Sequence, residues 1–289
     1  MNLVPLMADA RDEYVPSADG TPLKAWLWTR PQPRGVLVIA HGLGEHGGCY
    51  RHVAAALASS LDIDILAFDF RGHGRSPGRR GLVQSFDVLT ADLRGALAWT
   101  RAEKPRLPLF VLGHSYGGLV LLTALLAGEA GIAGLVLSNP ALRLAKPVPK
   151  HKRWAGALLR RFAPGITLNT DLGPEEMTRD PASLAERQND PLRHTRICAA
   201  IFYGMIEAGP LVSLQAAAIQ IPTLMIISGA DPIVDVGELH AFFDRLGSPD
   251  KTLRVFPDML HEPLNELGRE TVISEIAAWL AQRQAAPFT

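Results

Sequence analysis

Short apolar runs recur along the chain and alternate with segments of helical spacing. The runs, typical of strands buried on both faces of a sheet, cover residues 35–40, 63–70, 109–112, 132–139, 222–229 and 252–256. Segments in which apolar residues recur every three or four positions cover residues 50–60, 86–103, 119–126, 236–246 and 268–283. This alternation predicts an α/β protein whose mostly parallel sheet is covered by helices on both faces.

The N-terminal part of the chain departs from this alternation. Residues 13–29 contain two runs of strand character on either side of Asp19 and Gly20. An Asp-Gly pair between such runs favours a hairpin. We therefore expect two antiparallel strands at one edge, which completes a mostly parallel sheet of eight strands.

A second departure follows the strand at 132–139. The next clear strand begins at Pro222, 82 residues after Pro140 (222 − 140), whereas a crossover needs only about a dozen residues or somewhat more. The excess predicts a helical cap over residues 143–217, inserted after the sixth strand, with residues 191–208 as one of its helices. The core that carries the sheet would then comprise residues 1–142 and 218–289.

The amino-acid composition limits the size of the core, the binding partners and the cellular compartment that we expect for the protein. The 289 residues are 47% hydrophobic, enough for one large core with an insertion. Lys+Arg and Asp+Glu are equal at 29 each, so no overall charge favours nucleic acid. Cys49 and Cys198 lack disulfide or metal-site spacing, which favours a reducing compartment. With no signal-peptide pattern at the start and no run long enough to span a membrane, we expect a cytoplasmic protein.

The strongest chemical motif lies at residues 113–117, which have the form G-x-S-x-G between a buried strand and a buried helix. This pattern holds a serine at the tip of a sharp strand-to-helix turn. A side chain at Gly113 or Gly117 would collide where strand and helix approach each other. Ser115 is therefore expected at the end of the sheet, beside the positive end of a helix.

A serine nucleophile needs a base and a group that orients the base. Asp231 follows the strand at 222–229 and His261 follows the strand at 252–256, so both side chains are expected at the carboxyl edge of the sheet. The order Ser, Asp, His is the order of an α/β-hydrolase triad. Asp235 is the alternative acid. Asp231 precedes a proline, and an aspartate in that position is also explained by the formation of a turn alone.

An oxyanion hole requires two backbone N–H groups directed at the developing negative charge. The residue after the nucleophile, Tyr116, supplies one, and we expect Leu43, in the loop 41–46 after an early strand, to supply the other. His41 and His46 of this loop are more typical of residues that brace it. The remaining candidates lie in helix-like segments and are expected at the surface: His151, His194 and His240.

These features resemble the monoglyceride lipase/lysophospholipase branch of the α/β-hydrolases over nearly the whole core. The residues that carry the resemblance are 41–46, 69–78, 85–87 with 92–93, 113–118, 137–142, 229–231 with Val234, and 261–262. The cap matches the family only in position, in helical character and in residues 190–192. Asn139 stands where a second serine is expected, a departure without evident catalytic meaning. The resemblance implies a serine esterase that cleaves monoacylglycerols without cofactor or metal, with an apolar acyl tunnel under the cap.

Other functions share this scaffold. A general short- or medium-chain carboxylesterase and a proline-type aminopeptidase use the same triad; a peptidase would also need acidic residues to hold the substrate amine, and the cap offers four, Asp171, Glu175, Glu176 and Asp180. A protein of another class would bind a small apolar ligand without catalysis, but such proteins generally lose a triad member. Dehalogenase chemistry is disfavoured because Ser115 stands where a carboxylate nucleophile is needed.

Basic and aromatic residues alternate in the first part of the cap, over 146–162. One interpretation is a solvated helix face, and the other is transient contact with a membrane or micelle that holds the acyl substrate. A small-molecule ester with an acyl chain is the expected partner, and nucleic acid is not.

Overall fold

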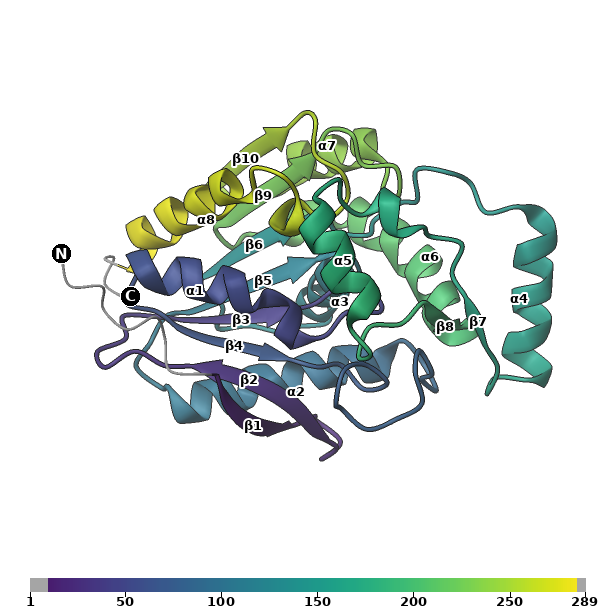
Figure 1. Cartoon of the computed structure of the whole chain (residues 1–289), viewed down its shortest axis with the longest axis horizontal. Helices are drawn as coiled ribbons and strands as arrows, with labels where there is room; N and C mark the ends of the chain where they lie inside the picture. Colours follow the sequence, from purple (N-terminus) through teal and green to yellow (C-terminus); the bar gives the residue numbers. More distant parts are fainter. Residues whose placement is uncertain (1–9, 285–289) are drawn as a thin grey trace.

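An eight-stranded sheet forms the centre of the protein in a computed structural model, which describes residues 10–284 (Figure 1). In spatial order its strands are β1 (Arg11–Pro16), β2 (Pro22–Trp28), β4 (Asp64–Phe68), β3 (Val36–Ala40), β5 (Leu109–His114), β6 (Gly134–Ser138), β9 (Thr223–Ser228) and β10 (Lys251–Phe256). β2 runs antiparallel to both β1 and β4, and the other neighbours are parallel. The predicted mostly parallel sheet of eight strands and its N-terminal hairpin are confirmed.

Helices cover both faces of this sheet and bury two apolar clusters. Side chains alternate along a strand, so in β3 Val36, Val38 and Ala40 face one cluster while Leu37 and Ile39 face the other. The first cluster lies under α2 (Asp87–Glu103), α3 (Ser115–Leu126) and α7 (Val236–Arg245), and the second under α1 (Arg51–Ser60) and α8 (Arg269–Gln284). Burial on both sides explains why these strands are almost continuously apolar.

The chain between β6 and β9 contains a separate group of elements. They are α4 (Lys150–Phe162), β7 (Thr167–Asn169), α5 (Pro181–Asn189), β8 (Arg196–Cys198) and α6 (Ala199–Leu214). Figure 1 shows them gathered beyond the carboxyl ends of the parallel strands, with α4 farthest from the sheet. This is the stretch for which the sequence predicts a cap of residues 143–217, and we use the word cap for these elements.

One predicted cap helix is misplaced. The sequence predicts a helix over 191–208, but α6 begins at Ala199, because residues 196–198 form β8 and pair with β7. The helix also continues past Pro210 to Leu214. Gly209 allows α6 to pass close to the loop that follows β6, because a Cβ at this position would lie 2.1 Å from the Leu142 carbonyl oxygen. The sequence did not predict α5 or the β7–β8 pair.

Within residues 10–284, four short 3₁₀ segments link these elements: η1 (Gly47–Tyr50), η2 (Pro174–Glu176), η3 (Ala216–Ala218) and η4 (Pro263–Asn265). Residues 1–9, where the absence of a signal peptide is predicted, lie outside the described residues. Among residues 10–284, no helix combines the length and apolar character needed to cross a membrane.

The turn from β5 into α3 is as sharp as the motif predicts. Ser115 has a φ of 50°, in the left-handed region that side chains rarely occupy. A Cβ on Gly113 would lie 2.7 Å from the Gly118 Cα, and one on Gly117 would lie 2.2 Å from the Ala40 carbonyl oxygen. The two glycines therefore let α3 start directly against β5 and β3.

We predict that Gly117→Ala lowers the free energy of unfolding by about 3 kcal/mol, because the new methyl group must push backbone apart. Chemical denaturation of the purified variant would measure this. Gly165→Ala is the matched control, since Gly165 is exposed and a Cβ there meets no atom within 4 Å. Equal stability of the two variants would contradict the close approach of α3 to β3.

Candidate active site

Three strand ends bring Ser115, His261 and Asp231 into one hydrogen-bonded chain. Ser115 begins α3 after β5, His261 follows β10, and Asp231 follows β9. The Ser115 Oγ lies 2.8 Å from the His261 Nε2, and the His261 Nδ1 lies 2.7 Å from an Asp231 carboxylate oxygen. The hydroxyl can thus donate to Nε2 while the Nδ1–H donates to Asp231. This is the arrangement that activates a serine.

The surroundings favour an ionised Asp231 and a basic His261. Burial acts to raise the pKa of Asp231, but His261 and the N–H groups of Ile233 and Val234, at 2.8 and 3.0 Å, hold it below its usual value. Burial acts to lower the pKa of His261, and Asp231 first among its neighbours raises it above 6.5 overall. The imidazole is therefore well suited to take up a proton.

Asp235, the alternative acid, has another role. Its carboxylate accepts the Glu238 N–H at 2.8 Å and so caps the N-terminus of α7. It also pairs with Arg143 at 3.1 Å. The structure therefore brings Asp231, and not Asp235, to His261.

The loop 41–46 is held by its own polar side chains. The His41 ring bonds to the Gly42 carbonyl at 2.7 Å and accepts the Phe70 N–H at 3.0 Å, so this residue braces the loop as expected. Glu45 accepts the Gly42 N–H at 2.8 Å. Among the described residues, the Leu43 N–H has no hydrogen-bond acceptor. The first turn of α3 likewise leaves the Tyr116 N–H without an intrahelical partner.

A segment of the cap lies directly on this loop. The His194 N–H donates to the Gly44 carbonyl at 3.0 Å, and a Cβ on Gly44 would meet the His194 carbonyl oxygen at 2.0 Å. The prediction that His194 is a surface residue in a helix is wrong. It lies half-buried in the turn before β8, and burial, followed by the charge of Arg80, lowers its pKa to about 4. His151 and His240 do lie on helices, α4 and α7.

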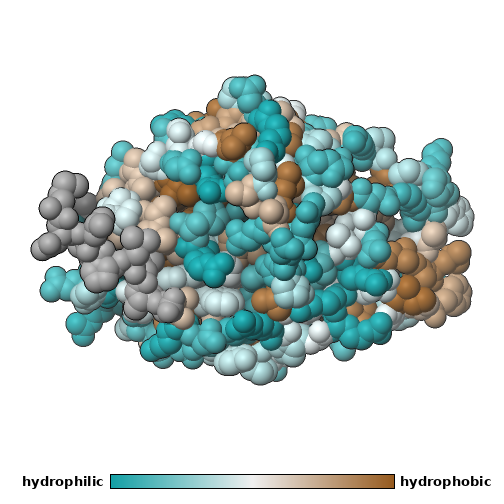
Figure 2. All heavy atoms as spheres, in the orientation of Figure 1, coloured by the Kyte–Doolittle hydropathy of each residue, from teal (hydrophilic) through white to brown (hydrophobic). Residues whose placement is uncertain are grey.

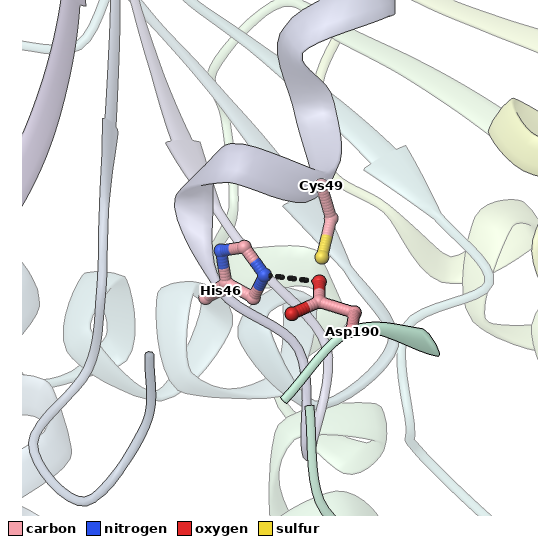
Figure 3. A group of neighbouring side chains, drawn as sticks. All are labelled: His46, Cys49 and Asp190. Carbon is pink, nitrogen blue, oxygen red and sulfur yellow. Dashed lines mark hydrogen bonds and ion pairs between the residues drawn. The ribbon is translucent and has the colours of Figure 1, made fainter. Parts of the chain in front are cut away.

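His46, Cys49 and Asp190 form the one group of described residues with the composition and spacing of a metal site (Figure 3). The His46 Nδ1 accepts the Gly48 N–H at 3.1 Å, so its Nε2 carries the proton and donates to Asp190 at 2.7 Å. That nitrogen then has no lone pair for a cation. Burial also raises the pKa of the Cys49 thiol, against formation of a thiolate ligand. The group is better explained as a hydrogen-bonded contact between core and cap.

Asn139 has a structural role that its sequence position did not reveal. It directly follows β6 with a φ of 41°, and its buried side chain reaches two neighbouring segments. The amide Nδ2 donates to the His261 carbonyl and the Ser228 Oγ, both at 2.9 Å, and the Oδ1 accepts the Ser228 N–H at 2.9 Å. Its place after a buried strand, at the same sheet edge as Ser115, was the available signal. Asn139 ties the backbone of His261 to β6 and β9.

A family model and several known proteins match the sequence of this chain. The profile of the family described as "Serine aminopeptidase, S33" matches residues 31–268. A monoacylglycerol lipase of Mycolicibacterium smegmatis is 32% identical over 88% of this chain and 91% of its own length. The monoglyceride lipase of Homo sapiens is 31% identical, over 96% and 92% of the two chains.

A solved structure supports the same relationship. The crystal structure of the Paleococcus ferrophilus monoacylglycerol lipase superposes with a TM-score of 0.81 and is 29% identical. The match covers 90% of this chain and 99% of that one.

We predict that Asn139→Ala destabilises the protein by about 3 kcal/mol, because the Ser228 N–H and the His261 carbonyl lose a buried partner at about 1–3 kcal/mol each. Thermal or chemical denaturation would report the loss. Asn189→Ala serves as the control, since the Asn189 side chain is exposed and bonds only within its own helix; we expect a change within about 0.5 kcal/mol. A similarly small effect at position 139 would disprove the tie.

Proposed function

The chain belongs to the hydrolase family described as Serine aminopeptidase, S33, and is homologous to monoacylglycerol lipases; from this we propose that it is a serine hydrolase that cleaves monoacylglycerols through an acyl-enzyme intermediate. The single observation that carries the catalytic assignment is the bonded chain Ser115–His261–Asp231. The geometry of this hydrogen-bonded chain supports nucleophilic catalysis by Ser115. The steps described below use no metal or cofactor.

In the first half-reaction, the Ser115 Oγ attacks the ester carbonyl carbon while its proton passes to the His261 Nε2. Asp231 stabilises the resulting imidazolium. The Leu43 and Tyr116 N–H groups donate to the oxyanion, and each such donor contributes about 2.7–4 kcal/mol to transition-state stabilisation. Collapse of the tetrahedral intermediate breaks the ester bond, and the departing alcohol takes the proton from His261.

In the second half-reaction, His261 removes a proton from water, and the hydroxide attacks the acyl carbon bound to Ser115. The second tetrahedral intermediate uses the same two N–H groups. Its collapse returns the proton to the Ser115 Oγ and releases the fatty acid. Atoms balance as one ester and one water giving one alcohol and one carboxylic acid.

The cap supports a lipid ester over a peptide substrate. An aminopeptidase needs free carboxylates near the serine to hold the substrate amine, but three of the four cap acids suggested by the sequence are engaged elsewhere. Asp180 caps α5 and pairs with Arg269, Glu176 accepts the Gly173 N–H, and Asp171 pairs with Lys152 at the surface. Glu175 is exposed. A general carboxylesterase remains the alternative within the same chemistry.

The outer helix of the cap supports collection of the substrate from a lipid surface. α4 has no buried residue, and Trp154 and Phe162 are each 73% exposed with Leu158 between them on the same face. Its charged residues are all basic: Lys150, Lys152, Arg153, Arg160 and Arg161. Figure 2 shows the hydrophobic patch at the end of the molecule where Figure 1 places α4. An apolar stripe flanked by basic residues is typical of helices that bind anionic membrane surfaces.

We predict that Ser115→Ala abolishes labelling by a fluorophosphonate probe and lowers kcat for 1-monoacylglycerols by about 10⁴-fold or more, since the nucleophile is lost. Circular dichroism would verify that the variant stays folded. Full residual activity would overturn the proposal, and a wild-type protein that the probe does not label would favour non-catalytic ligand binding. A chain-length series of monoacylglycerols against p-nitrophenyl esters separates the lipase from a general carboxylesterase.

We predict that the double variant Trp154→Ala/Phe162→Ala binds vesicles containing anionic lipid at least about tenfold more weakly, because a fully buried aromatic side chain contributes about 1.5–3 kcal/mol. Vesicle sedimentation measures the binding, and hydrolysis of a water-soluble p-nitrophenyl ester should be unchanged. Leu267→Ala, which removes an apolar side chain that is 58% exposed on the core, is the control. Undiminished binding of the double variant would show that α4 is only a solvated helix.

A further inference from the structure

Two buried carboxylates flank the Ser115–His261–Asp231 chain. Glu45 belongs to the loop that contains Leu43, and Glu262 directly follows His261; their side chains are only 2% and 5% exposed. One Glu45 oxygen accepts the Gly42 N–H and the Tyr50 hydroxyl, both at 2.8 Å. A carboxylate removed from water in this way needs an opposite charge nearby.

The cap supplies that charge. The Arg193 Nη1, from the turn between α5 and β8, lies 3.4 Å from Glu45 and 3.6 Å from Glu262, and Arg187 of α5 also pairs with Glu262. Both arginine side chains are largely buried. Within residues 10–284, no lysine or arginine of the core forms an ion pair with either carboxylate. The four charges sum to zero only while the cap lies on the core.

The four charged residues Glu45, Glu262, Arg187 and Arg193, here called the quartet, are electrostatically coupled to the catalytic groups. Burial acts to raise the pKa of Glu45, but Arg193, followed by His114 and Arg187, holds it below its usual value. Asp231 is the first charge that raises the pKa of His261, and Glu262 and Glu45 raise it further. His114 also lies beside His261, and the centroids of the two rings are 5.1 Å apart. Carboxylates without their arginines would therefore stabilise the protonated His261.

We propose that Arg193 and Arg187 are positioning residues by which the cap activates the core: they neutralise Glu45 and Glu262, hold the loop of Leu43 in place through Glu45 and Gly42, and keep His261 available as a base near neutral pH. The proposal rests on the roles of Ser115, His261 and Leu43 given under Proposed function. It makes activity depend on a charge contributed from outside the hydrolase core. Neither arginine touches the reacting atoms.

Arg193→Gln tests this proposal through the pH profile. The acidic limb of kcat/KM reports protonation of the base in the free enzyme. Removing a positive charge beside two carboxylates should move that limb upward by about half a pH unit or more. kcat should fall about tenfold, because the oxyanion donor is held less precisely, while KM stays within about twofold. Arg196→Gln, at an exposed arginine of β8, should leave the profile unchanged.

Two further variants separate charge from packing. Arg193→Lys keeps the charge and should return the acidic limb to its wild-type position. Arg193→Gln combined with Glu45→Gln removes one charge of each sign and should also return the limb, although kcat stays low. If Arg193→Gln does not fold, Arg187→Gln at the edge of the quartet should show the same upward shift at smaller size.

The outcomes distinguish this inference from the proposed function. A wild-type enzyme that cleaves monoacylglycerols, together with unshifted acidic limbs in Arg193→Gln and Arg187→Gln, would overturn the activation by the cap and leave the triad intact. An upward shift that Arg193→Lys does not reverse would also overturn it. If the wild-type Ser115 neither reacts with fluorophosphonate nor cleaves esters, the proposed function itself fails.

Discussion

The close contact between the first turn of α3 and the end of β3 is the constraint on which the site depends. It exists because Gly117 has no side chain to keep the two backbones apart. The contact sets Ser115, in its left-handed conformation, beside the loop that carries Leu43. The ends of β9 and β10 then need only place Asp231 and His261 within hydrogen-bond reach. The backbone geometry of the turn at Ser115 thus determines where the loops after β3, β9 and β10 must place their residues to reach the serine.

The core was predictable from the sequence because its signals are local. Strands buried on both faces leave continuous apolar runs, and the serine turn leaves a glycine pattern, so the sheet and the proximity of Ser115, Asp231 and His261 were predictable before the structure. The catalytic roles of these three residues, and of Leu43 and Tyr116, stay predictions. The choice between Asp231 and Asp235 depends on the three-dimensional structure, because the sequence allows either residue to be a turn or N-cap residue, and in the structure Asp235 is the N-cap of α7.

The cap was poorly predictable because its segments are short and half-exposed. The apolar residues that suggest a helix over 191–208 lie mostly beyond residue 198, and pairing of β7 with β8 fixes residues 196–198 as a strand. The buried contacts of Asn139, Arg193 and His194 join residues far apart in sequence and leave no periodic signal. The equal numbers of acidic and basic residues in the whole chain also concealed a local separation of charge: the charged residues of α4 are all basic, and a balanced group of four charges lies beneath the cap.

The lack of any buried residue in α4 has a consequence for how such a protein can change over generations. Substitutions at exposed positions generally alter stability by less than about 0.5 kcal/mol, so this helix can exchange its aromatic and basic residues almost freely. The glycine at position 117 and the arginine at position 193 have no such freedom. Substitutions in this peripheral helix can therefore change the proposed contact with a lipid surface, while the residues proposed for ester cleavage are inherited unchanged.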